Sequence, residues 1–82
     1  NVEETVLATL LEIARTHAPD RAAIAPGDVL VNDLGFESLD LALAVAELEA
    51  KLGLDPFATE TTIGTVRTVG DFVAVYQRAA KP

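Results

Sequence analysis

The sequence predicts a single all-α domain over residues 1–82, and three observations support this prediction. Half of the residues are apolar, but only three Phe and one Tyr are aromatic, so the core must be built mainly from Leu, Val, Ile and Ala. That composition favours packed helices over a sandwich or barrel, whose strands are rich in aromatic and β-branched residues. Apolar residues also recur at helical spacing in three segments. Finally, the chain has no cysteine for a disulfide or a thiolate metal site, so helix packing must supply its stability.

The first helix is expected over residues 2–16. Acidic residues lie near its start and basic ones near its end, as the helix dipole favours. The apolar positions that repeat at helical spacing are Val2, Val6, Leu10 and Ile13. Pro19 ends the segment, and we expect His17 to cap the carboxyl end of this helix.

Residues 18–37 contain too many Pro, Gly, Asn and Asp residues for a regular element and are expected to form a long loop. A loop of this length is uncommon inside a small domain unless it is functional or packs its own apolar side chains against the core. The candidate anchors are Ile24, Val29, Leu30, Leu34 and Phe36.

The second helix is expected over residues 38–52, because this stretch lacks Pro and Gly and is followed by Gly53 as a left-handed cap. It carries two apolar stripes. The first has core spacing and comprises Leu41, Ala44 or Val45, Leu48 and Leu52. The second lies on an adjacent face and comprises Leu39, Ala42, Leu43 and Ala46. A surface helix of a small domain cannot bury both stripes, so the second is expected to bind a partner.

The remaining chain predicts one short helical turn within 59–65 and a last helix over 69–79. Thr68 and Asp71 have the spacing of a capping box at the start of that helix. Three main helices and one short helix result. We expect the core to bury Leu10, Val45, Leu48 and Phe72.

The formal net charge is −7, from 13 acidic and 6 basic residues. This charge repels the phosphates of nucleic acids and would steer the domain toward basic patches on partner proteins. No stretch approaches the roughly 18 apolar residues of a membrane span, and residues 1–4 lack the basic region of a signal peptide. We therefore expect a soluble, cytoplasmic monomer that binds neither nucleic acid nor membrane.

The inventory of catalytic and metal-binding residues is small. The chain has a single histidine and no cysteine, so a Ser-His-Asp set would have to use His17. Four acids lie close together in sequence, but they lack the alternating spacing of a calcium loop. They are Asp28, Asp33, Glu37 and Asp40. We expect neither an enzyme nor a metal site.

The segment 33–41, with the sequence DLGFESLDL, places Ser38 at the junction of the loop and the second helix. Local physics alone explains this serine equally well as a helix N-cap. The string resembles the phosphopantetheine attachment signature of acyl and peptidyl carrier proteins, in which an acidic residue, Leu and Gly precede a Ser-Leu pair. The similarity extends over nearly the whole chain, because the order of helices and the long loop also resemble that family.

The resemblance implies an acyl-carrier-protein-like four-helix bundle with a long loop between its first two helices. It also implies that Ser38 receives 4′-phosphopantetheine from coenzyme A, attached by a phosphopantetheinyl transferase that uses Mg²⁺. The carrier domain would then hold acyl or aminoacyl groups as thioesters and would not itself be an enzyme. Its further partners would be an adenylating ligase, an acyltransferase, a ketosynthase or a condensation enzyme.

Two departures from the family pattern refine this expectation. Many members have Asp or His directly before the serine, where this chain has Glu37. Many fatty-acid carriers have several acids along the partner side of the second helix, where this chain is apolar, which is more similar to carriers of polyketide or nonribosomal peptide biosynthesis. The apolar centre of the expected partner surface comprises Leu39, Ala42, Leu43 and Ala46, and its acidic rim comprises Glu37, Asp40, Glu47 and Glu49.

Two alternatives stay open at this point. The first is a non-catalytic helical interaction module without a covalent cofactor, in which Ser38 is an inaccessible N-cap. The second is a small serine hydrolase, which requires His17 to approach Ser38. The position of His17 at the end of the first helix disfavours the hydrolase.

Overall fold

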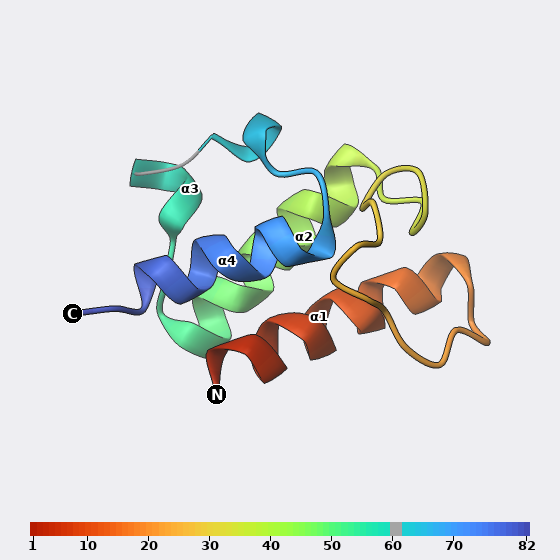
Figure 1. Cartoon of the computed structure of the whole chain (residues 1–82), viewed down its shortest axis with the longest axis horizontal. Helices are drawn as coiled ribbons and strands as arrows, with labels where there is room; N and C mark the ends of the chain where they lie inside the picture. Colours follow the sequence, from red (N-terminus) through yellow and green to blue (C-terminus); the bar gives the residue numbers. More distant parts are fainter. Residues whose placement is uncertain (60–61) are drawn as a thin grey trace.

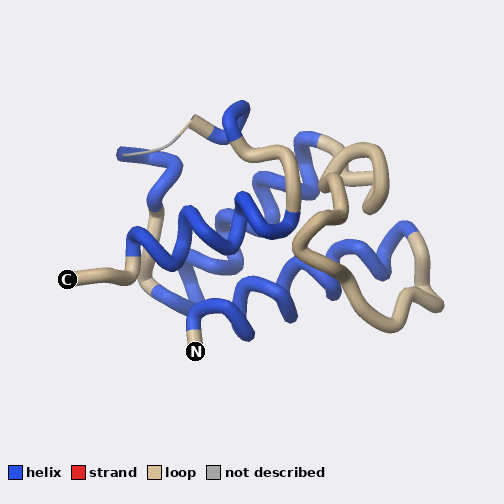
Figure 2. Tube along the Cα trace, in the orientation of Figure 1, coloured by secondary structure: helices blue, strands red, loops and turns tan. Residues whose placement is uncertain are grey.

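The protein is a small helical bundle. The computed structural model describes residues 1–59 and 62–82, without the side chain of Thr59. Its elements are α1 (Val2–His17), α2 (Ser38–Leu52), α3 (Pro56–Thr59), the 3₁₀ helix η1 (Ile63–Thr65) and α4 (Val69–Ala79). Within the described residues there is no strand, only one isolated bridge between Val29 and Thr68 (Figures 1 and 2). The all-α prediction is confirmed.

The bounds of the three long helices agree with the sequence because local signals set them. Gly53 ends α2 in a left-handed backbone conformation, with φ 69°. Glycine is favoured there because a side chain makes this conformation sterically unfavourable. Thr68 accepts a hydrogen bond from the Asp71 N–H at 3.0 Å, and the Asp71 carboxylate accepts one from the Thr68 N–H at 3.0 Å. This reciprocal cap starts α4 where the sequence predicted it.

The connection between α2 and α4 agrees with its prediction in one part only. The expected short helical turn within 59–65 is present as η1, but the sequence did not predict α3 over Pro56–Thr59, and residues 60 and 61 lie outside the described part. Pro56 opens α3, because proline suits the first position of a helix, where its missing N–H costs nothing. Phe57 packs α3 onto α4 through Phe72 and Tyr76, with ring centroids 5.5 and 6.0 Å away.

The core lies where α1 meets both α2 and α4. Leu10, Leu48 and Phe72 are fully buried, as predicted. Val45 was predicted to be buried but is only partly so, whereas the smaller Ala44 has no exposed surface. The face of α2 that packs against the core is therefore centred on Ala44 and Leu48 rather than on Val45.

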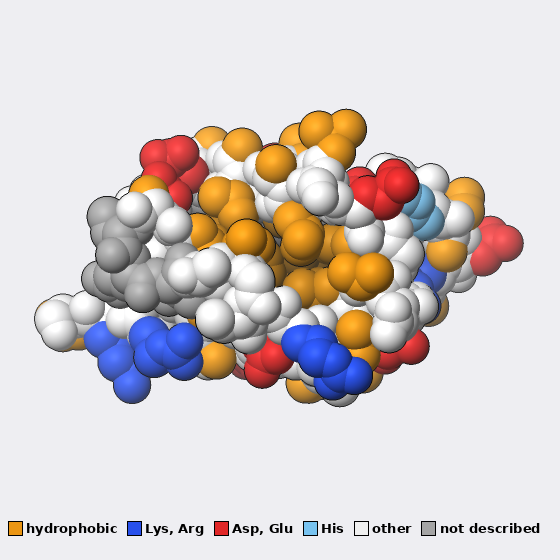
Figure 3. Space-filling view, turned by 90° about the horizontal axis from the view of Figure 1, so that it is seen from above, with side chains coloured by type: hydrophobic (Ala, Val, Ile, Leu, Met, Phe, Trp, Pro, Cys, Tyr) orange, Lys and Arg blue, Asp and Glu red, His pale blue; other side chains and the backbone are white. Residues whose placement is uncertain are grey.

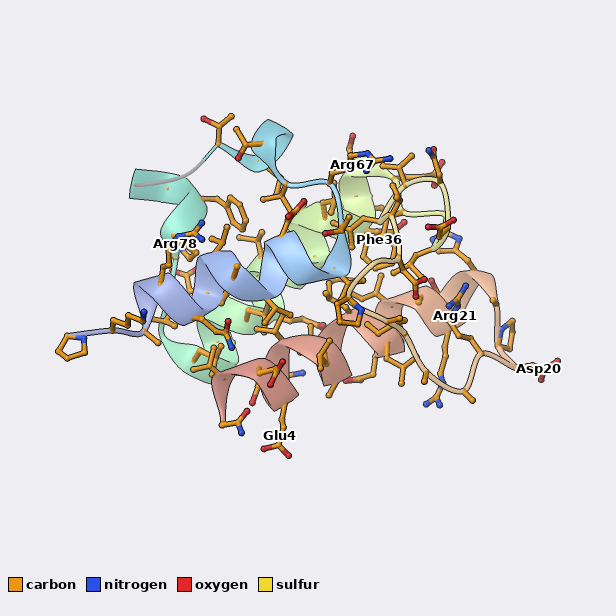
Figure 4. All side chains as sticks on the ribbon, in the orientation of Figure 1. Glu4, Asp20, Arg21, Phe36, Arg67 and Arg78 are labelled. Carbon is orange, nitrogen blue, oxygen red and sulfur yellow. The ribbon has the colours of Figure 1, made fainter. Side chains whose placement is uncertain are left out.

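The long loop between α1 and α2 packs against the bundle through three buried anchors, Leu30, Leu34 and Phe36. The other two predicted anchors, Ile24 and Val29, are only partly buried. Backbone hydrogen bonds tie the loop to the start of α4: the Leu30 N–H donates to the Arg67 carbonyl at 3.0 Å, and the Val69 N–H donates to the Asp28 carbonyl at 2.9 Å. Arg67 accordingly lies beside the loop, and Phe36 on the side of the loop toward the helices (Figure 4).

The close approach of loop and α4 requires a glycine. The Gly70 N–H donates to the Pro26 carbonyl at 2.9 Å, and a Cβ at Gly70 would lie 3.1 Å from that oxygen. Arg21 joins separate parts of the loop, because its guanidinium donates to the Asp33 carbonyl at 3.2 Å and lies 3.7 Å from the Asp28 carboxylate (Figure 4). No helix in the described part of the chain is long and apolar enough to cross a membrane.

Candidate functional site

Ser38 is the first residue of α2 and is the only serine in the chain. The N-cap is Glu37, with an extended backbone, so the alternative that Ser38 itself is the cap is wrong. Ser38 is exposed, and its hydroxyl forms no hydrogen bond with another described residue. The hydroxyl is therefore free to react.

Asp40 performs the capping that Ser38 does not. Its Oδ2 accepts the Glu37 N–H at 2.8 Å and lies 2.8 Å from His17 Nε2, which must donate because a carboxylate only accepts. The prediction that His17 caps its own helix is thus wrong: it bonds across to α2 and links the end of α1 to the start of the serine helix. Asp40 was expected at the rim of a partner surface. Its side chain is instead only 15% exposed, and its carboxylate is hydrogen-bonded to His17 and to the Glu37 N–H.

The hydrogen bonds at Asp40 predict a specific acid response. The Glu37 N–H, assisted by His17, holds the pKa of Asp40 below its ordinary value of 3.8, so the ionised form stabilises the fold above that pH. The stabilisation is lost as the pH falls through the lower pKa of the folded state, because the unfolded chain binds the proton first. We expect Asp40→Asn to lower the melting temperature at neutral pH and to weaken its further fall in acid.

Circular dichroism melts from about pH 2 to 7 check this expectation. Asp20→Asn is the matched control, because Asp20 is exposed and outside the site. The pKa of Asp71 is lowered in the same way by the N–H groups of Thr68 and Arg67, so part of the acid response should persist in both variants. Parallel curves for wild type and Asp40→Asn would contradict the role of Asp40.

The second apolar stripe of α2 is exposed, as predicted from its phase. Leu39 is 79% exposed and Leu43 is 45% exposed, and both alanines of the stripe are exposed as well. Among the predicted rim acids, Glu37 and Glu49 are exposed, whereas Glu47 is partly buried. The Glu47 Oε2 has no hydrogen-bond partner among the described residues. The expected partner surface thus keeps its apolar centre but has fewer free acids.

An apolar groove of about 430 Å³ begins at Ser38 and runs along α2. One wall follows three turns of the helix, and the other comes from the segment after it. The α2 wall consists of Ser38, Leu41, Ala42, Val45, Ala46 and Glu49, and the opposite wall of Asp55 and Ile63. Figure 3 shows apolar side chains gathered around a hollow in this face, with acidic groups at its margins. Ala42 and Ala46 thus belong to both the predicted stripe and the groove.

The sequence interpretation missed the groove and its second wall. Asp55 directly precedes α3, which was not predicted, and the position of Ile63 opposite α2 depends on the path of the whole connection, so this wall could not be anticipated. The sequence did contain one indication of the groove, since positions 38, 41, 42, 45, 46 and 49 have the spacing that places residues on one face of a helix. Four of these six residues are apolar and two are polar, and the polar ones lie at the two ends.

The remaining chemistry at Ser38 is limited. A hydrolytic triad places its histidine between serine and acid, whereas His17 here bonds Asp40 and makes no hydrogen bond to Ser38 within residues 1–59 and 62–82. The end of α1 nevertheless lies close to the start of α2, since His17 contacts Asp40, two positions after the serine. The carboxylates of Asp28 and Asp33 accept hydrogen bonds from N–H groups of the loop, at 2.8 and 2.7 Å.

No protein-family model, curated protein or solved structure matches this chain, so its function has to be inferred from these residues.

Proposed function

We propose that this domain is a carrier protein that bears 4′-phosphopantetheine on Ser38 and holds acyl or aminoacyl groups as thioesters. The observation that carries the proposal is the unused hydroxyl of the chain's only serine, exposed at the start of α2 within the attachment-like string. The first turn of a helix offers unpaired N–H groups and a positive dipole end, which favour a phosphodiester there. The residues present therefore fit the group.

Attachment would be a phosphoryl transfer from coenzyme A. The Ser38 oxygen forms a bond to the β-phosphorus, the pyrophosphate bond breaks, and 3′,5′-adenosine bisphosphate leaves, while the hydroxyl proton passes to a base of the transferase. The group supplies the thiol that this cysteine-free chain lacks. The domain accelerates no reaction and presents its cargo to a ligase, acyltransferase, ketosynthase or condensation enzyme of polyketide or nonribosomal peptide biosynthesis.

Labelling with a fluorescent coenzyme A derivative and a promiscuous phosphopantetheinyl transferase tests the proposal. We expect transferase-dependent labelling of the folded domain, because Ser38 is accessible. The alternative, an interaction module without a cofactor, would use the same exposed leucines of α2 but needs no reactive hydroxyl. Absence of label from folded protein would favour that module.

The apolar stripe makes a separate prediction about partner enzymes. Leu43→Ala should leave the domain folded and able to accept phosphopantetheine, because this side chain is 45% exposed. Loading by the cognate ligase or acyltransferase should slow about fivefold or more, since a central contact in an interface contributes about 1 kcal/mol or more. Quantitative mass spectrometry of the loaded species over time measures the rate.

Val31→Ala is the control for Leu43→Ala, because Val31 is a 58% exposed apolar residue of the loop rather than of α2. It should be loaded at the wild-type rate. If Leu43→Ala also matches wild type while added salt slows every protein strongly, acidic residues rather than the stripe determine recognition. If Leu43→Ala unfolds, the residue belongs to the core.

A further inference from the structure

The groove has a consistent order of polar and apolar positions. Ser38 lies at one end, and Glu49, eleven residues later on the same face of α2, lies at the other. Asp55 follows the end of α2 closely in sequence and therefore belongs to the Glu49 end. Between these ends the lining side chains are apolar. The groove is thus an apolar channel with a hydroxyl at its start and two carboxylates at its finish.

The distance between the two ends matches a phosphopantetheine arm. Eleven residues of α-helix span about 16 Å. The arm contains about fourteen bonds from the serine oxygen to its sulfur. An extended polypeptide advances about 3.5 Å per residue of three backbone bonds, or about 1.2 Å per bond, so an extended arm reaches about 17 Å. An arm that starts at Ser38 and follows the groove therefore places its thioester near Glu49.

The two carboxylates have no cationic partner in the fold. Every Lys and Arg lies in the described part of the chain, and none of them forms an ion pair with Glu49 or Asp55. The negative potential at this end extends into the protein. Burial, followed by the charges of Asp55 and Glu49, raises the pKa of Tyr76 to about 12. The Tyr76 hydroxyl is buried, without a hydrogen-bond partner among the described residues.

We propose that Glu49 and Asp55 bind the α-ammonium group of an aminoacyl cargo whose arm lies in the apolar groove of α2. The inference rests on the proposed carrier function and assigns its substrate class: aminoacyl groups rather than simple fatty acyl groups. In an aminoacyl thioester the ammonium lies two bonds from the thioester carbon, so it reaches the carboxylates when the sulfur is near Glu49. The side chain of the amino acid would extend past Ile63 on the opposite wall.

Two arms that differ only in the ammonium test this assignment. Transferase-catalysed attachment installs either a leucyl or a 4-methylpentanoyl arm, each with an amide in place of the thioester so that it cannot hydrolyse. Intact mass verifies attachment, and ¹⁵N–¹H spectra then follow the amides of Glu49, Asp55 and Ile63. We expect the leucyl arm to shift the two acidic residues about two- to fivefold more than its desamino counterpart, as a partly exposed ion pair allows. High salt should reduce that difference.

The Glu49→Gln/Asp55→Asn protein should lose the difference between the two arms. Glu3→Gln/Asp20→Asn is the matched control, because it removes two exposed acids outside the groove and should keep the difference. Equal shifts from both attached arms in wild type would overturn the cargo assignment and leave the carrier function intact. Larger shifts from the desamino arm would also overturn it, because the groove would then select apolar cargo. Absence of attachment by mass would overturn both proposals.

Discussion

Replacing Leu48 by alanine should remove a large part of the stability of the domain. Leu48 is fully buried on the stripe of α2 that faces the core, where α2 packs against α1. Truncating a large buried side chain leaves a cavity and costs about 2–5 kcal/mol. A chain of this length has about 4–12 kcal/mol of stability in total. We therefore expect the melting temperature of Leu48→Ala to fall by on the order of 10–30 °C.

Leu43→Ala is the matched control for this prediction, since it makes the same chemical change on the same helix at an exposed position. Its melting temperature should stay within about 2 °C of wild type, as usual for surface substitutions. Thermal melts by circular dichroism compare the two. Equal effects of the two substitutions would mean that the assigned phase of α2 is wrong.

The helix bounds could be predicted because they depend on residues close in sequence. Gly53 and the Thr68–Asp71 pair act within one turn of the helices that they end or start. The phase of α2 was harder to assign, because Ala44 and Val45 are both apolar and a single residue apart. Only the packing of α1 shows that the smaller of the two is buried. α3 was not predicted, because the Pro56 at its start is as compatible with a turn as with the first position of a helix.

The candidate site was predictable at its centre but not at its edges. Ser38 followed from its motif, and the exposure of Leu39 and Leu43 followed from helical spacing. The bond between His17 and Asp40 joins residues 23 positions apart, and the groove wall at Asp55 and Ile63 depends on how the chain returns after α2. Such contacts are set by tertiary packing, which no local pattern encodes.

Ser38→Ala should abolish attachment of phosphopantetheine completely. The substitution removes the only serine hydroxyl, and alanine at the first position of a helix is well tolerated because the capping contacts are made by Asp40. The variant should therefore melt close to wild type. Thr62→Ala is the matched control, because it removes an exposed hydroxyl that makes no capping bond in η1, and it should be modified normally.

Intact mass after incubation with coenzyme A, Mg²⁺ and a promiscuous phosphopantetheinyl transferase tests the carrier function most directly. Wild type and Thr62→Ala should each gain the mass of one phosphopantetheinyl group, and Ser38→Ala should gain nothing while remaining folded. An equal gain in Ser38→Ala, or no gain in folded wild type, would contradict the account that this domain carries its cargo on Ser38.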